Sequence, residues 1–104
     1  MPSKKFRIPR KKIAEFCKRW GITEFSVFGS VLREDFRPDS DIDVLISLDR
    51  NSPVGLLEFA RMQIELENLF KHPVDLIEKE FLRYPYRKWE ILRTAQVIYV
   101  NAPG

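Results

Sequence analysis

The sequence predicts an α/β (α+β) fold, in which helices pack on a β-sheet, and three observations support this prediction. Segments with apolar residues at helical spacing alternate with short segments rich in β-branched and aromatic residues, in the order α-β-α-β-α-β-α-β. The length of 104 residues and the hydrophobic share of 44% fit one domain with a single core. No repeat or low-complexity stretch divides the chain, so we expect one domain over residues 1–104. The spacing is compatible with a mixed sheet and with a purely parallel one.

The first half of the chain is predicted to contain a long helix, a helical turn and two strands. A helix is expected over residues 9–20, whose apolar residues recur at i, i+3, i+4 and i+7. Residues 24–28 alternate and are rich in β-formers, which predicts a strand. We expect a short helical turn over 30–35 and a loop over 36–40. The next strand is predicted over 41–48, and its β-branched and leucine content fits a central, covered position.

The second half is predicted to contain two helices and two short strands. Helical spacing of apolar residues predicts a helix over 56–71, and a strand follows over 74–78. Residues 84–86 (Tyr-Pro-Tyr) indicate a loop, followed by a helix over 87–95 and a last strand over 97–100. Three residues of that last helix are expected on one core-facing side: Trp89, Leu92 and Ala95.

Composition excludes several classes of protein. The lone Cys17 cannot form an internal disulfide, and no second cysteine exists to build a cysteine-rich zinc site. Cys17 lies on the apolar side of the first predicted helix, where we expect it in the core. No apolar run approaches the roughly 20 residues that cross a membrane, and the N-terminus lacks the apolar stretch of a signal peptide. We therefore expect a cytoplasmic protein with no membrane partner.

The net charge of +3 conceals an asymmetry along the chain. Residues 1–20 hold eight Lys or Arg against Glu15, whereas residues 21–104 hold ten basic groups against fourteen acidic ones. A basic arm of this kind could attract nucleic acid. The alternative is a solvated helix face preceded by a flexible basic tail over residues 1–8. We favour this alternative, because no aromatic side chains are interleaved at stacking positions in the arm.

Two carboxylates stand two residues apart in an apolar strand. Asp41 and Asp43 would point to the same face, because successive side chains of a strand alternate. Like charges this close repel unless a cation lies between them. Asp75 stands in a similar apolar setting, so three carboxylates converge if the two strands are neighbours. Such a set suits Mg²⁺, and two ions about 3.5–4 Å apart can clamp the attacking and leaving oxygens of a phosphoryl transfer. Most Asp-x-Asp pairs, however, lie at surface turns or strand ends.

A possible phosphate site precedes these acids. Gly29 lets backbone amides approach a phosphate closely, and a helix starting at Ser30 would offer unpaired N–H groups. Arg33, one turn later, could neutralise phosphate charge. The simpler alternatives are an N-cap for Ser30 and solvated surface for Arg33.

Taken together, Phe28-Gly29-Ser30, Asp41-Ile42-Asp43 and Asp75 resemble the signature of the nucleotidyltransferase superfamily founded on DNA polymerase β. With Arg33 and Ser40 added, the pattern Gly-Ser-x-x-Arg…Ser-Asp-Ile-Asp resembles the minimal nucleotidyltransferase branch. The resemblance covers residues 9–100 and implies a small mixed sheet flanked by helices.

The resemblance also implies a role for each matched residue. Asp41 and Asp43 would hold two Mg²⁺ ions, and Asp75 would complete the metal site and help activate an acceptor hydroxyl. The substrate ATP would be bound by four residues: Gly29, Ser30, Arg33 and Ser40.

Minimal members of this family commonly act as antitoxins beside a small helical toxin of the HEPN class, and some transfer AMP from ATP to a tyrosine of that toxin. The resemblance therefore implies a protein adenylyltransferase with a HEPN partner. The alternative is a non-catalytic antitoxin that neutralises its partner by forming a complex. The short chain leaves no room for a second, acceptor-binding domain, so we expect the acceptor to be small or presented by a partner.

Overall fold

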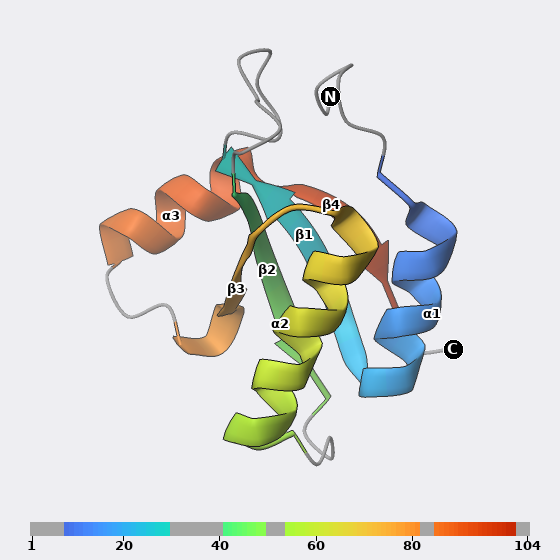
Figure 1. Ribbon diagram of the computed structural model, residues 1–104. Helices are drawn as coiled ribbons and strands as arrows, with labels where there is room; N and C mark the ends of the chain where they lie inside the picture. The colour runs from blue at the N-terminus through green and yellow to red at the C-terminus, as the bar shows by residue number, and fades with distance from the viewer. Residues whose placement is uncertain (1–7, 30–40, 50–53, 82–84, 102–104) are drawn as a thin grey trace.

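The computed structural model describes residues 8–29, 41–49, 54–81 and 85–101 (Figure 1). Its four strands form one sheet in the order β3-β2-β1-β4. The strand bounds are Ile22–Phe28 for β1, Ile42–Leu48 for β2, Val74–Glu78 for β3 and Gln96–Val100 for β4. β1 is antiparallel to both β2 and β4, whereas β2 is parallel to β3. The sheet is therefore mixed, which confirms the predicted fold class.

Within the described residues, three α-helices cover this sheet on two sides. They are α1 (Arg10–Trp20), α2 (Leu56–Phe70) and α3 (Pro85–Thr94), and a short 3₁₀ helix, η2 (Lys79–Phe81), follows β3. α1 and α2 lie beside each other on one face, and α3 lies on the other (Figure 1). Within the described ranges, no helix combines the length and apolar character needed to cross a bilayer.

The helix boundaries follow from local chemistry. α1 ends at Gly21, whose φ of 74° is left-handed and whose N–H donates to the carbonyl of Cys17. α2 begins after Gly55, whose N–H donates to the carboxylate of Glu58 at 2.9 Å. Residues 30–35 and 36–40, predicted as a helical turn and a loop, lie outside the described residues.

Side chains alternate between two apolar clusters on opposite faces of the sheet. The main cluster lies under α1 and α2 and contains Ile42, Val44 and Ile46 of β2, as the strand pattern predicted. The smaller cluster lies under α3 and consists of Phe28, Leu45 and Ile91, with Ile77 and Ala95 packed against it. Both faces of β2 are therefore covered in its middle, which explains the apolar run of Val44, Leu45 and Ile46.

The structure corrects three expectations. Ile8, assigned to a flexible tail, is only 9% exposed and packs in the main cluster, while residues 1–7 lie outside the described ranges. Pro85 starts α3 instead of lying in a loop, which suits the first turn of a helix because proline lacks an N–H. Trp89 is 61% exposed, and the buried side of α3 carries Ile91. Ile91 and Ala95, four residues apart, face the sheet, and Trp89 lies about half a turn away.

Candidate active site

The structure brings Asp43 and Asp75 together. They are register partners in the parallel pair of β2 and β3, and register partners project to the same face of a sheet. Leu45 and Ile77, two residues further along each strand, belong to the cluster under α3, so both carboxylates lie on that same face. Asp43 is half-buried and Asp75 is exposed. The expectation that the two strands are neighbours is therefore correct.

Gly29 lies directly against this pair. Phe28, the residue before it, is the register partner of Asp43 across the antiparallel pair of β1 and β2. Gly29 has a φ of 78°, and a β-carbon at this position would collide with the carboxylate of Asp43. Only glycine meets both demands, because it tolerates positive φ and leaves the space that the carboxylate fills. The start of the predicted phosphate-binding segment thus touches the predicted metal ligand.

Asp41 stands just outside β2 and is exposed. The next residue, Ile42, donates its N–H to the carbonyl of Pro73 at 2.8 Å. This bond ties the start of β2 to the residue before β3 and fixes the register that places Asp43 beside Asp75. All three acids therefore lie near one end of the β2–β3 pair.

Several predicted site residues remain outside this description. Ser30, Arg33 and Ser40 fall in residues 30–40, which the structure does not describe. Among the described residues, no group of three or more His, Cys, Asp or Glu side chains is close enough to hold a metal ion. What the structure assembles is Gly29, Asp43 and Asp75, with Asp41 two residues before Asp43.

The donor chemistry fits a hard divalent cation. Carboxylate oxygens are the ligands that Mg²⁺ prefers in proteins, and Mg²⁺ is usually held by one or two of them together with substrate phosphates. Asp43 and Asp75 supply two such groups from neighbouring strands, and Asp41 supplies a third from the same segment as Asp43. The segment that begins at Gly29 runs directly beside the Asp43 carboxylate.

An apolar cluster beside these acids, on the same face of the sheet, was not predicted from the sequence. Phe28, Leu45 and Ile91 are 8%, 2% and 7% exposed and pack against one another under α3. Leu45 lies on the same face as Asp43, so one side of β2 changes from polar to apolar within two residues. The sequence contains the pattern that indicates this cluster. Leu45 is an apolar residue on the otherwise polar face of β2, and Ile91 and Ala95 stand four residues apart, which places them on one side of a helix.

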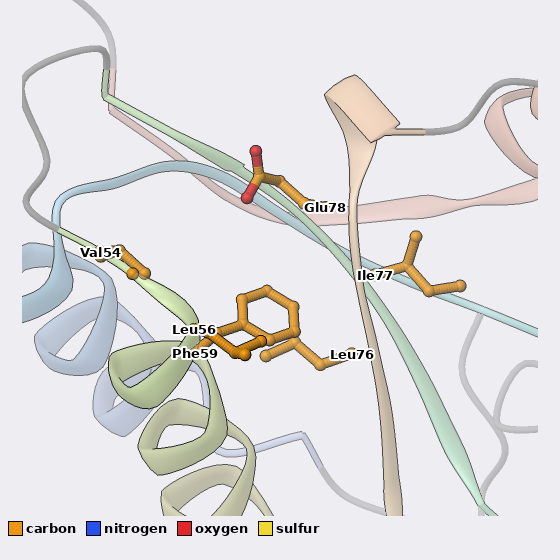
Figure 2. A pocket seen from close by; sticks show the side chains of 7 residues that line it. Val54, Leu56, Phe59, Leu76, Ile77 and Glu78 are labelled. Carbon is orange, nitrogen blue, oxygen red and sulfur yellow. The ribbon is translucent and has the colours of Figure 1, made fainter.

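A separate cavity of about 510 Å³ lies at the other end of β3 (Figure 2). Its lining is mainly apolar and comes from the start of α2 and the end of β3: Val54, Gly55, Leu56, Phe59, Leu76, Ile77 and Glu78. Burial raises the pKa of the Glu78 carboxyl, and the nearby charge of Glu80 adds to the effect. Glu78 pairs in register with Ile46, three positions beyond the pairing of Asp43 with Asp75. The cavity is therefore distinct from the carboxylate site.

Residues 10–98 match the family described as the nucleotidyltransferase domain, and the chain belongs to that family. Protein adenylyltransferase MntA of Thermococcus cleftensis is 36% identical over 86 residues, which cover 83% of this chain and 82% of the relative. A candidate protein adenylyltransferase of Methanocaldococcus jannaschii is 34% identical over 84 residues, covering 81% and 84% of the two chains. These matches confirm the resemblance and the assignment as a nucleotidyltransferase.

Solved structures agree with this family assignment. A candidate minimal nucleotidyltransferase superposes with a TM-score of 0.70 at 34% identity, covering 84% of this chain and 86% of the other. A toxin–antitoxin complex crystallised with AMP-PNP gives a TM-score of 0.71 at 14% identity, over 90% of this chain and 75% of that chain. The second likeness, at its low identity, concerns the fold alone.

Proposed function

We propose that this chain is a Mg²⁺-dependent adenylyltransferase and an antitoxin, which transfers AMP from ATP to a tyrosine hydroxyl of a helical HEPN-class partner. The observation that carries the proposal is the register pairing of Asp43 with Asp75 beside Gly29. The Thermococcus relative named as a protein adenylyltransferase supports the choice of reaction, and the similar fold crystallised with AMP-PNP supports ATP as the donor. Use of ATP also supports a cytoplasmic location.

Asp41 and Asp43 are proposed to hold the metal, together with Asp75. Bound there, two Mg²⁺ ions would neutralise the phosphate charge and polarise the reacting oxygens. Phe28 and Leu45 lie beside Asp43 on the same face of the sheet, so apolar side chains border the site on one side. Charge interactions are stronger in such a setting than in open water.

The remaining residues are proposed to position the nucleotide and the acceptor. Gly29 and Ser30, with Arg33 and Ser40, would hold the triphosphate. Asp75, the more exposed acid of the register pair, would accept the proton of the attacking hydroxyl. The acceptor oxygen then forms a bond to the α-phosphorus of ATP, the bond from that phosphorus to the bridging oxygen breaks, and pyrophosphate leaves. AMP remains on the acceptor.

We expect the neighbouring gene to encode the proposed HEPN-class partner. The test is transfer of label from [α-³²P]ATP to the product of that gene, with Mg²⁺ present. We expect labelling by the wild type and at least a hundredfold slower labelling by Asp43→Asn, since a metal ligand stabilises the transition state by several kcal/mol, that is, about a hundredfold or more in rate. Asp49→Asn is the control, because it makes the same chemical change at an exposed aspartate that follows the opposite end of β2. Equal labelling by wild type and Asp43→Asn would exclude this role for Asp43.

A binding-only antitoxin is the alternative, and the same variants separate the two functions. The double variant Asp41→Asn/Asp43→Asn should lose neutralisation of the toxin if catalysis is required. Full neutralisation by this variant, with labelling abolished, would show that complex formation is sufficient.

A further inference from the structure

The cavity between α2 and β3 has the size and the lining of a small-molecule site. Its volume of about 510 Å³ falls within the range of roughly 300–1,000 Å³ that ligand pockets occupy. Figure 2 shows the Phe59 ring and Leu76 together between α2 and β3. Leu76 belongs to the main apolar cluster, and Phe59 packs against it. Leu56 lines the same cavity and is 89% exposed. The cavity therefore offers apolar surface that an aromatic or aliphatic group can cover.

Glu78 is the one charged residue among the described residues that line this cavity. It stands two residues after Leu76, so both side chains lie on the α2 side of β3. Leu76 packs in the main cluster, which places the Glu78 carboxylate at the edge of an apolar wall. Part of the water that would solvate a carboxylate is excluded there.

The charged neighbours of Glu78 already have partners, whereas its own carboxylate has none among the described residues. Lys79 donates to Glu24 at 3.0 Å, and Glu80 accepts a hydrogen bond from Ser47. Glu58, near the mouth of the cavity, accepts the N–H of Gly55. The parts of the chain that the structure describes give the Glu78 carboxylate no hydrogen bond and no ion pair. A cation brought by a ligand would complete its interactions.

We propose that this cavity binds a small organic amine, with its apolar body against Phe59 and Leu76 and its cationic end paired with Glu78. The apolar walls of the cavity would contact the apolar part of the amine, and the Glu78 carboxylate would favour a ligand whose end group is positively charged. An anion of the same shape would meet Glu78 with the wrong sign, and the charge of Glu80 adds to that repulsion. The cavity is thus unsuited to a nucleotide, which the carboxylate site at the other end of β3 is proposed to bind.

The two sites are separate, so this inference does not rest on the proposed function. Asp75 lies on the α3 side of the sheet near the start of β3, whereas Glu78 ends that strand on the α2 side. An amine in the cavity therefore neither covers nor completes the carboxylate site. Binding of an amine and transfer of AMP can each fail without the other.

Fluorescence titration with two matched probes tests the inference. Dansylcadaverine has an aromatic body and a primary ammonium group on a five-carbon chain, and N-dansyl-6-aminohexanoate has the same body and chain with a carboxylate. We expect dansylcadaverine to bind with a blue shift and increased emission, as the dansyl group does in an apolar site. N-dansyl-6-aminohexanoate should bind at least tenfold more weakly, because its negative charge faces Glu78.

Two substitutions locate the bound probe. Glu78→Gln should weaken the binding of dansylcadaverine by about tenfold and should remove most of the preference for it over N-dansyl-6-aminohexanoate. Leu56→Lys places a competing ammonium group at the mouth of the cavity and should also weaken dansylcadaverine by about tenfold. The Leu56→Lys protein should fold like the wild type, because Leu56 is 89% exposed. Glu15→Gln is the matched control, since it removes one negative charge from an exposed site on α1.

Several outcomes would overturn the inference. Absence of dansylcadaverine binding by the wild type up to about 1 mM would show that the cavity is not a site for amines. Equal affinity for the two probes, or equal affinity of wild type and Glu78→Gln, would exclude recognition of the cation by Glu78. Unchanged binding by Leu56→Lys would place the probe elsewhere on the surface. Circular dichroism of each variant establishes that it is folded. Because the two sites are separate, saturating Mn²⁺–ATP should not displace dansylcadaverine from the wild type.

Discussion

The backbone of Gly29 lies against the carboxylate of Asp43, with no room between them for a β-carbon. Gly29 follows β1, and Asp43 belongs to the neighbouring strand β2. The contact thus joins the start of the predicted phosphate-binding segment to a predicted metal ligand. It also gives the glycine a physical role, because its φ of 78° is one that other residues rarely adopt.

Gly29→Ala should therefore damage both stability and activity. The alanine methyl must displace the Asp43 carboxylate and also adopt a left-handed conformation, which alone costs about 1–2 kcal/mol. Urea unfolding measures the stability, and label transfer measures the activity. Gly55→Ala is the control, because Gly55 has a φ of −100° and an added β-carbon meets only the flexible end of Glu58. A Gly29→Ala protein with wild-type activity would show that the close contact is dispensable.

Substitutions on the buried side of α3 should lower the free energy of unfolding more than substitutions on its exposed side. Ile91→Ala removes a side chain that is 7% exposed and should lower the free energy of unfolding by about 2–4 kcal/mol. Trp89→Ala removes a larger side chain that is 61% exposed and stacks with the Arg93 guanidinium 4.8 Å from its ring centre. Its loss should cost about 1 kcal/mol or less. Chemical denaturation of both variants is the measurement, and a larger cost for Trp89→Ala would contradict the packing of α3.

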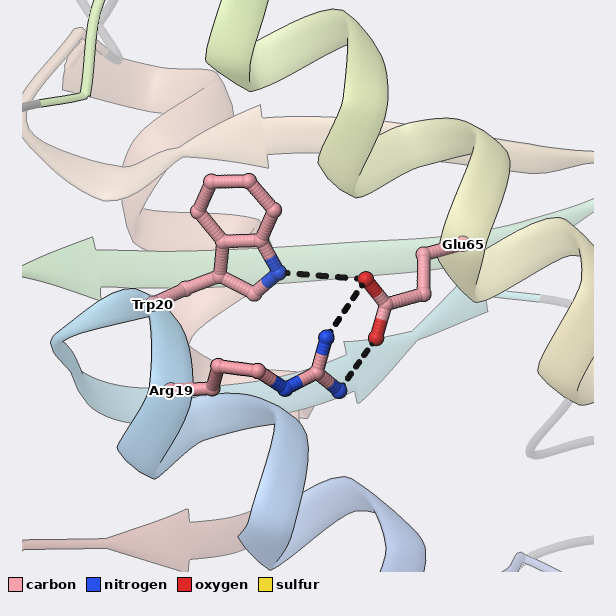
Figure 3. Close-up of polar contacts among 3 residues, drawn as sticks. All are labelled: Arg19, Trp20 and Glu65. Carbon is pink, nitrogen blue, oxygen red and sulfur yellow. Dashed lines mark hydrogen bonds and ion pairs between the residues drawn. The ribbon is translucent and has the colours of Figure 1, made fainter.

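Glu65→Gln should loosen the contact between α1 and α2. The Glu65 carboxylate accepts bonds from Arg19 Nη1 at 3.0 Å and from Trp20 Nε1 at 3.3 Å (Figure 3). The Arg19 side chain is 59% exposed, so solvent screens the pair and the expected loss is only about 1 kcal/mol. Thermal unfolding at low salt should show it as a fall in Tm of about 4–8 °C. High salt should narrow the difference between wild type and variant, and a difference that grows with salt would contradict an electrostatic origin.

The buried thiol of Cys17 should make the free energy of unfolding fall as the pH rises above 9. Burial raises the pKa of its thiol from the ordinary value of 9.0 to about 12. Between these values the unfolded chain loses the thiol proton while the folded chain keeps it. The stabilising contribution is therefore complete below pH 9 and is lost as the pH rises towards 12, with a slope of at most about 1.4 kcal/mol per pH unit.

Unfolding free energies of wild type and Cys17→Ala, compared between pH 8 and about pH 10.5, measure this contribution. The variant should be less stable at pH 8, because it leaves a small cavity, but its stability should fall less steeply with pH. Identical slopes would mean that the thiol ionises equally in the folded and unfolded chains.

The strands that carry the site could be predicted because their pattern is local. Asp43 stands in an alternating apolar segment, and strand periodicity alone places Ile42 and Val44 on the opposite face. The same reasoning gave the bounds of β3 at 74–78 without error. Helix spacing likewise placed Cys17 in the core, where it is fully buried.

Which strands pair with each other could not be predicted from such local patterns. Whether β3 pairs with β2 depends on contacts between residues about thirty positions apart, and periodicity carries no information on such pairing. The mixed sheet itself was implied only by the family resemblance. The buried side of α3 was misassigned because a large aromatic residue, Trp89, was given more weight than Ile91, although a ten-residue helix can bury only one narrow side.

Binding of Mn²⁺–ATP tests the central claim most directly, since Mn²⁺ substitutes for Mg²⁺ and is visible by electron paramagnetic resonance. The wild type should bind the complex, and Asp43→Asn should weaken binding by at least tenfold, because a carboxylate ligand is lost beside Gly29 and Asp75. Asp49→Asn should bind like the wild type. Equal affinity of wild type and Asp43→Asn would contradict the assignment of the Asp43–Asp75 pair as the metal–nucleotide site.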